Sequence, residues 1–352
     1  MHLKPLLLCA FAAAITLPAA PVHAGPIRDR ILQRMQERNG GEAGNANAAD
    51  GDLADMGGGN AQSCAEWSKK VNRLQERAAG RNTGPAPDMK DVPYGTHNLE
   101  KLDVYLPKPT ASGAAAPVIL MVHGGGWCVG DKAAGGVAAN KVARWGAKGF
   151  VFVSINYPMV SDGRDALAQG NEVAKAVAYV QANAQKWGGD PARLILMGHS
   201  AGAHLVSLVN AVPAIRQAHA LKPVLGVVSL DAGAMDVVKQ MPNVYPFLKV
   251  RYTEAFGSTE AQWITASPFH KLGAGAAPWL GVCSSKRKDD PCGQAQAYAD
   301  KSRGLGVKAA VMPEPKGHGA INKELGLPGE YTSGVEAFMA TLDPVVAGLL
   351  GK

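Results

Sequence analysis

Two uninterrupted apolar runs, each ending in a glycine-rich turn, restrict the fold more than any other feature. Residues 118–122 read VILMV and residues 194–197 read LILM, with no polar residue in either run. A strand with one solvated face alternates apolar and polar residues, whereas a continuous apolar run indicates a strand buried on both faces. Such a strand lies in a sheet that helices cover on both sides. The two runs therefore predict an α/β fold.

The rest of the chain agrees with this fold class, because strand-like and helix-like segments alternate from about residue 94. Strands are expected at 102–106, 118–122, 150–155, 194–197, 224–230, 279–283 and 309–312. Helices are expected at 64–79, 138–147, 164–186, 201–211, 293–304 and 332–341. This order predicts a mostly parallel sheet between two layers of helices.

The N-terminus has the pattern of an export signal. Lys4 precedes an apolar run from Leu6 to Leu17, and small residues at Val22 and Ala24 mark a cleavage site. The run is shorter than the roughly 20 residues that span a bilayer. We therefore expect residues 1–24 to be a signal peptide and the mature chain to be secreted or periplasmic, with no membrane span.

Composition then divides the mature chain. Residues 25–63 begin with a short charged helical stretch and continue in Gly, Ala, Asn and Asp, which predicts a flexible linker before a domain at 64–352. The net charge of +7 is dispersed and lacks the aromatic-interleaved basic stripe of a nucleic-acid surface, so no nucleic-acid partner is expected. No His/Cys cluster has zinc-site spacing, so no metal is expected.

Export makes the cysteines candidates for disulfides. Of the five cysteines, Cys9 leaves with the signal, and the four that remain allow three pairings that sequence cannot separate. The short separation favours Cys283–Cys292, which by default leaves Cys64–Cys128.

The motif Gly198-His199-Ser200-Ala201-Gly202 follows the apolar run at 194–197 and precedes a helix-forming segment. A serine in a tight strand-to-helix turn presents its hydroxyl above the sheet, and the turn leaves little room for side chains at the two glycine positions. The motif alone is weak in a chain this rich in glycine. Its place between a buried strand and a helix predicts that Ser200 is a nucleophile.

A second glycine motif, His123-Gly124-Gly125-Gly126-Trp127, follows the run at 118–122. Consecutive glycines let the backbone turn its N–H groups toward a ligand, and acyl transfer needs such donors where an oxyanion develops. The amide of Ala201, directly after the nucleophile, is a further donor. A loop that serves only close packing is the alternative interpretation.

The two motifs together, with Gly189-Asp190-Pro191 before them, resemble the α/β-hydrolase superfamily, in particular hormone-sensitive-lipase-like and kynurenine-formamidase-like esterases. The resemblance covers about residues 90–345. It implies an α/β-hydrolase fold, an enzyme without metal or organic cofactor, and an oxyanion hole formed by the amides of Gly125, Gly126 and Ala201.

In this fold the catalytic residues follow the order Ser, acid, His along the chain. Among the nine histidines, His318 alone follows every plausible acid, and it stands between two glycines after the last predicted strand. We expect His318 to be the general base. His123 and His199 lie inside the motifs and are expected to orient loops, whereas His204 and His270 are weaker candidates.

The position of the acid stays open between three aspartates. The resemblance places it after the strand at 279–283 and favours Asp289. Asp290 is the neighbouring alternative and is also suited to cap the next helix, while Asp231 follows the preceding strand. We also expect a Cys283–Cys292 bridge to hold the loop that carries Asp289 and Asp290.

These assignments predict a serine hydrolase that cleaves a small-molecule carboxylic ester. An arylformamidase-type amidase and a carbohydrate or feruloyl esterase are the alternatives, and a binding protein on a hydrolase scaffold is the non-enzymatic one. Trp127 is expected to line the substrate pocket. Residues 232–265 exceed the length of a simple connection and are expected to form a small lid.

Overall fold

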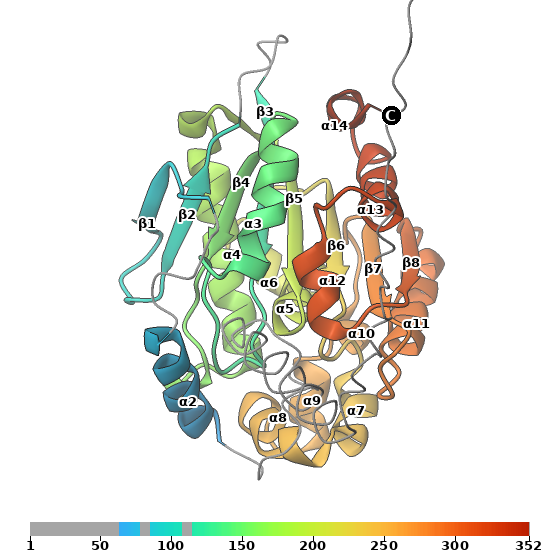
Figure 1. The fold of residues 1–352 in the computed structure, drawn as a ribbon. Helices are drawn as coiled ribbons and strands as arrows, with labels where there is room; N and C mark the ends of the chain where they lie inside the picture. Colours follow the sequence, from blue (N-terminus) through green and yellow to red (C-terminus); the bar gives the residue numbers. More distant parts are fainter. Residues whose placement is uncertain (1–62, 78–84, 108–114, 352) are drawn as a thin grey trace, which may run out of the picture. The chain divides into compact units, whose positions relative to one another are not determined.

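The computed structural model describes residues 63–77, 85–107 and 115–351, which all belong to one unit spanning Gly44–Lys352. Its centre is an eight-stranded sheet in the order β1-β2-β4-β3-β5-β6-β7-β8 (Figure 1). The strands are β1 Met89–Pro93, β2 Lys101–Tyr105, β3 Ala116–Val122, β4 Val151–Ile155, β5 Gly189–His199, β6 Gly226–Leu230, β7 Trp279–Ser284 and β8 Ala309–Glu314. The predicted signal peptide at 1–24 and nearly all of the predicted linker at 25–63 lie outside the described residues.

The direction of the strands confirms the predicted fold class. From β4 to β8 across the sheet every neighbouring pair is parallel, and only β1 and β2 run antiparallel to their neighbours. The sequence analysis did not predict β1. Its residues, MKDVP, include two charged side chains and end in proline, a composition that suits the exposed edge of a sheet and gives no continuous apolar run.

The central strands are buried on both faces, as their apolar runs predicted. In β3, Val118, Leu120 and Val122 belong to one core cluster, while Ile119 and Met121 belong to another. Because successive side chains of a strand point to opposite faces, the two clusters are the two sides of one sheet.

Helices supply the other half of each core. On one face the sheet packs against α4 Ala166–Asn183, α5 Ala201–Ala211, α6 Pro213–Ala218 and α11 Pro291–Gly304. On the other face it packs against α3 Gly135–Lys141, α12 His318–Glu324, α13 Glu330–Ala340 and α14 Pro344–Leu350. The predicted helix at 201–211 coincides with α5, and the one at 64–79 matches α2, Cys64–Arg77, whose last two predicted residues lie outside the described range.

The long connection after β6 is a helical excursion. It contains α7 Val237–Gln240, α8 Lys249–Phe256 and α9 Glu260–Thr265, followed by α10 Pro268–Lys271. Figure 1 shows α7, α8 and α9 at the end of the sheet where the parallel strands finish, near α2. This position is the one from which residues 232–265 can cover a site at the carboxyl ends of the strands.

Two disulfides fasten the connections at the same end of the sheet. Cys64 at the start of α2 is bonded to Cys128, with a Cα–Cα distance of 4.9 Å. Cys283 in β7 is bonded to Cys292 in α11, with a Cα–Cα distance of 5.2 Å. Both pairs are the ones favoured by sequence.

Candidate active site

Ser200 lies alone between a strand and a helix, since β5 ends at His199 and α5 begins at Ala201. Its backbone has φ 56° and ψ −116°, a strained conformation for a residue with a side chain. A side chain at Gly198 would clash with the backbone of Gly202, and one at Gly202 would clash with the backbone of Val122. Both glycines are therefore required by space, and the turn has the geometry predicted for a nucleophile.

His318, the predicted base, is the first residue of α12 and lines the same pocket as Ser200. His199 helps to hold it there: its Nε2 donates to the His318 carbonyl oxygen over 3.0 Å, and the two rings lie 4.5 Å apart. Burial and the neighbouring His318 hold the pKa of His199 well below its ordinary value, so His199 is a neutral donor. It orients the loop, as the sequence predicted.

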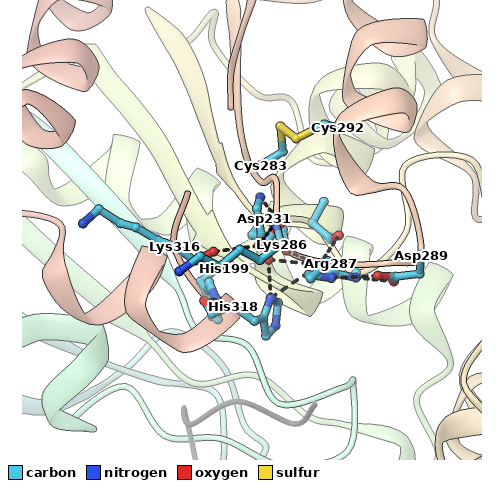
Figure 2. A network of polar contacts seen from close by, with 12 residues as sticks. His199, Asp231, Cys283, Lys286, Arg287, Asp289, Cys292, Lys316 and His318 are labelled. Carbon is cyan, nitrogen blue, oxygen red and sulfur yellow. Dashed lines mark hydrogen bonds and ion pairs between the residues drawn. A yellow bond between two sulfur atoms is a disulfide. The ribbon is translucent and has the colours of Figure 1, made fainter. Parts of the chain in front are cut away.

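The carboxylate that meets His318 is Asp231, not Asp289. His318 Nδ1 donates to Asp231 Oδ2 over 2.5 Å, and the Asp231 side chain is completely buried (Figure 2). Asp231 directly follows β6, and its other oxygen accepts the Ser284 amide at 2.8 Å. Burial by itself raises the pKa of Asp231, but Arg287, His318 and the Ser284 amide together lower it below its usual range. Asp289, which the sequence analysis favoured as the acid, therefore does not meet His318.

Asp289 and Asp290 have other partners. Asp289 accepts from Arg287 Nε at 3.0 Å and from Nη2 at 2.5 Å. Asp290 is exposed, accepts the Gly293 amide at the start of α11 over 3.0 Å and pairs with Lys239 at 2.8 Å. Asp290 is thus a helix cap, as its alternative interpretation held. The Cys283–Cys292 bridge holds the loop that carries Asp289 and Asp290, whereas Asp231, the carboxylate that meets His318, belongs to the connection before it.

Arg287 is a site residue that sequence reasoning missed. Its Nη1 lies 3.1 Å from Asp231 Oδ2, and its other nitrogens pair with Asp289. In Figure 2 the guanidinium therefore lies between His318 and Asp289. Burial lowers the pKa of Arg287, but the two carboxylates more than reverse this effect. The charge stays in place and fixes Asp231 as a carboxylate. In sequence it stands in an ordinary basic run, Lys286 to Lys288, which carries no signal of this role.

The glycine loop at residues 124–126, which is predicted to form the oxyanion hole, lies against the strand-to-helix turn that carries Ser200. A side chain at Gly124 would meet the Cβ of Ser200 at 2.9 Å, which places this loop beside the nucleophile. Gly125 and Gly126 have φ values of +116° and +60°, which favour glycine, and Gly126 lines the pocket. The amide of Ala201 is the first of α5 and has no partner within its own helix.

Trp127 is held by a polar contact and by ring contacts. Its Nε1 donates to His204 Nδ1 at 3.2 Å, and its ring meets Tyr252 and Phe256 edge-on, with centroids 5.0 Å and 4.7 Å away. Burial lowers the pKa of His204 to about 4, so this histidine is neutral and accepts the tryptophan N–H. Trp127 lines the pocket, as the sequence predicted, and anchors α8 over it.

The pocket joins these elements to the excursion after β6. Its lining is Gly126, Trp127, Ser200, Gly233, Tyr245, Leu248, Arg251, Tyr252, Arg287, Asp289 and His318. Within the described residues, no group of three or more His, Cys, Asp or Glu side chains is arranged to hold a metal ion. None of the helices in residues 63–77, 85–107 and 115–351 combines the length and hydropathy that crossing a bilayer requires.

Solved structures with the same architecture identify the fold. Esterase B from Lactobacillus rhamnosis superposes with a TM-score of 0.61 at 16% identity, covering 81% of this chain and 96% of that one. A truncated carbohydrate esterase from gut microbiota also gives 0.61, at 21% identity, covering 77% of this chain and all of that one. The chain has the α/β-hydrolase fold. At these identities the solved structures support the fold and not a particular activity.

The similarity to sequence relatives extends over shorter stretches of the chain than the structural similarity does. The BD-FAE family model matches residues 102–232. Esterase LipQ of Mycobacterium tuberculosis is 30% identical over 251 residues, which are 67% of this chain and 58% of LipQ. Kynurenine formamidase of Danio rerio is 36% identical over 121 residues, 34% of this chain and 38% of that protein. The chain therefore spans less than two thirds of the length of either relative.

Proposed function

We propose that this α/β-hydrolase cleaves carboxylic esters through an acyl-enzyme on Ser200, with His318 as the base and Asp231 as the acid. The observation that carries the proposal is the buried hydrogen bond between Asp231 and His318, in a pocket that His318 shares with Ser200. The esterase among its sequence relatives supports the same reaction class.

In the proposed mechanism His318 Nε2 takes the proton of Ser200 as its oxygen attacks the substrate carbonyl. The amides of Gly125, Gly126 and Ala201 stabilise the oxyanion, each worth about 3 kcal/mol in comparable sites. The proton then passes to the leaving alcohol, and a water molecule releases the acid by the same steps in reverse. Asp231 keeps the imidazole in the tautomer with a proton on Nδ1 and balances its charge when Nε2 is protonated.

The second candidate for the activity is that of a formamidase or of a carbohydrate or feruloyl esterase. The formamidase relative and the carbohydrate esterase among the structural neighbours favour it. The same residues would attack a formamide carbonyl, and only the group that leaves would differ. Turnover of paired esters and formamides with a common aromatic group separates the two.

Replacing the nucleophile tests the proposal directly. Ser200→Ala should lower turnover of a nitrophenyl ester on the order of 10⁴–10⁶-fold, since losing the nucleophile removes the covalent step. The thermal midpoint should stay near that of the wild type. Ser333→Ala, which changes an exposed serine on α13, is the matched control and should keep full activity. A Ser200→Ala protein with a tenth of the wild-type rate would refute the assignment.

Export of the protein is part of the proposal. The two disulfides are compatible with an oxidising compartment, and the sequence at 1–24 has the pattern of a signal peptide. We propose that the mature chain begins at Gly25, with a linker to residue 63 and the catalytic domain at 64–352, where residues 232–265 act as a lid. N-terminal sequencing of protein recovered from outside the cytoplasm tests the cleavage site.

A further inference from the structure

Two arginines line the pocket, and their surroundings differ. Arg287 lies between two carboxylates, Asp231 and Asp289, and its charge is compensated. Arg251, on α8, has no carboxylate within ion-pair distance among the described residues. Its side chain is nevertheless more than nine-tenths buried, with 6% of its surface exposed.

The hydrogen-bond donors of Arg251 are mostly unused. Its Nη2 donates to the Phe247 carbonyl oxygen over 3.2 Å, whereas Nε and Nη1 are buried and find no partner among the described residues. Its guanidinium lies over the Trp67 ring, 4.6 Å from the centroid. Burial lowers the pKa of Arg251, and the nearby Tyr252 and Glu254 offset this effect only in part. Unpaired donors on a buried charge are costly, and a ligand anion in the pocket would relieve that cost.

The other charges of the pocket do not take this role. Arg287 and Asp289 neutralise each other through two hydrogen bonds. Asp231 balances His318 whenever the imidazole is protonated during the proposed reaction. Arg251 is therefore the lining cation that no described carboxylate pairs with, and it shares the pocket with Ser200.

We propose that Arg251 binds a carboxylate carried by the substrate, so that the natural substrate is an anionic ester. This inference rests on the proposed esterase function and specifies its substrate class. The neighbouring lining is apolar or aromatic, from Trp127, Leu248 and Tyr252. A substrate that fits has an apolar or aromatic segment between the ester that meets Ser200 and the carboxylate that meets Arg251.

Matched pairs of esters test the proposal on either side of the ester bond. Ethyl hydrogen glutarate is compared with ethyl 5-methylhexanoate, and 3-acetoxybenzoate with 3-isopropylphenyl acetate, each by pH-stat. Wild type should favour the anionic member of at least one pair. Arg251→Met should raise KM for that anionic ester roughly 10- to 100-fold, the usual effect of losing a charged hydrogen bond, and change kcat/KM for its neutral partner less than about threefold.

Two further variants separate binding from packing. Arg251→Lys keeps the charge and should restore part of the preference. Lys249→Met removes an exposed positive charge from the same helix and should leave both esters of a pair unchanged. If Arg251→Met affects the anionic and neutral esters equally, the arginine only supports α8 against Trp67, and the proposal fails.

A binding measurement distinguishes this failure from failure of the esterase assignment. In Ser200→Ala protein, calorimetry with the two anionic esters should detect binding that Arg251→Met removes. Absence of binding, or binding that survives the substitution, overturns the role of Arg251. Binding that requires Arg251 in a wild-type enzyme with no ester turnover would uphold the anion site and refute the proposed function.

Discussion

The connections after β6 and β7 each follow a buried strand and each bring an aspartate to the site, but the two aspartates are held in different ways and contact different groups. Asp231 comes immediately after β6; its amide donates to the Val282 carbonyl oxygen at 2.8 Å, and its φ is 48°. Asp289 lies five residues beyond the end of β7, in a loop whose Lys286 and Lys288 are exposed. The first aspartate is held by the sheet itself, and the second by Arg287.

The difference shows how a catalytic acid is positioned. An acid must hold its carboxylate within hydrogen-bond distance of an imidazole, and small displacements are costly. At the end of a strand, the hydrogen bonds of the sheet fix the backbone position of the residue. The loop after β7 instead contributes Arg287, whose guanidinium pairs with the carboxylate of Asp231.

Removing the two aspartates separately gives the largest expected effect. Asp231→Asn should lower kcat/KM for a nitrophenyl ester on the order of 10³–10⁴-fold, because His318 loses the partner that sets its tautomer. Asp289→Asn should cost less than roughly tenfold, and Asp290→Asn, the exposed control, should stay near wild type. A larger loss in Asp289→Asn than in Asp231→Asn would reverse the assignment of the two loops.

Removing the cation between the loops should have the next largest effect. Arg287→Met leaves two buried carboxylates facing each other, which should lower the free energy of unfolding by about 3–5 kcal/mol. Turnover should fall about 10- to 100-fold, because Asp231 remains but is held less firmly. Denaturant unfolding and steady-state kinetics measure the two effects. Adding Asp289→Asn to Arg287→Met should restore part of the stability. The absence of any recovery would contradict the pairing of Arg287 with both carboxylates.

Opening the bridge of the second loop should affect stability more than chemistry. Cys283→Ser with Cys292→Ser should lower the free energy of unfolding by about 2–3 kcal/mol, the chain-entropy value for so short a loop. Turnover should stay within about threefold of wild type where the protein is folded, since the acid is elsewhere. Cys64→Ser with Cys128→Ser is the comparison, because Cys128 follows the oxyanion loop, and it should lower turnover more. The reverse order would mean that the loop after β7 positions the acid after all.

The smallest expected effect is on acid stability. The pKa of Asp231 is lower in the folded chain than its ordinary 3.8, because Arg287, His318 and Ser284 outweigh burial. The folded state therefore binds this proton less readily than the unfolded state, and the stabilisation is full above the unfolded pKa and lost as pH falls through the folded one. Urea unfolding from pH 6 to pH 3 should show wild type losing its advantage over Asp231→Asn below about pH 4. A constant difference across that range would contradict the shift.

Much of the site could be predicted because its signals are local. Ser200 and the glycines around it occupy one strand-to-helix turn. The steric reason for Gly198 lies within the pentapeptide, whereas the reason for Gly202 is the backbone of Val122 on the neighbouring strand. His318 could be placed by chain order within the resembled fold. The strand β1 could not, because an exposed edge strand needs no apolar pattern.

The acid and the arginines could not be placed in this way, because their roles depend on which distant groups meet. Asp231 stands directly after a predicted buried strand, but chain order allowed Asp289 as well, and the resemblance favoured Asp289. Nothing in the run Lys286 to Lys288 distinguishes Arg287 from its neighbours. Nothing in α8 marks Arg251 as a buried cation that pairs with no carboxylate among the described residues.

The amino-acid order thus settles the buried strands, the turns that follow them and the chemistry that each turn can present, since these depend on residues a few positions apart. Which carboxylate faces the imidazole, which cation is compensated and which is left open depend on packing between segments as distant as Asp231 and His318. A hydrogen bond or an ion pair forms only between groups a few ångströms apart, and distance along the chain does not predict distance in space. The identity of the acid and the charge of the pocket are therefore properties of the folded structure.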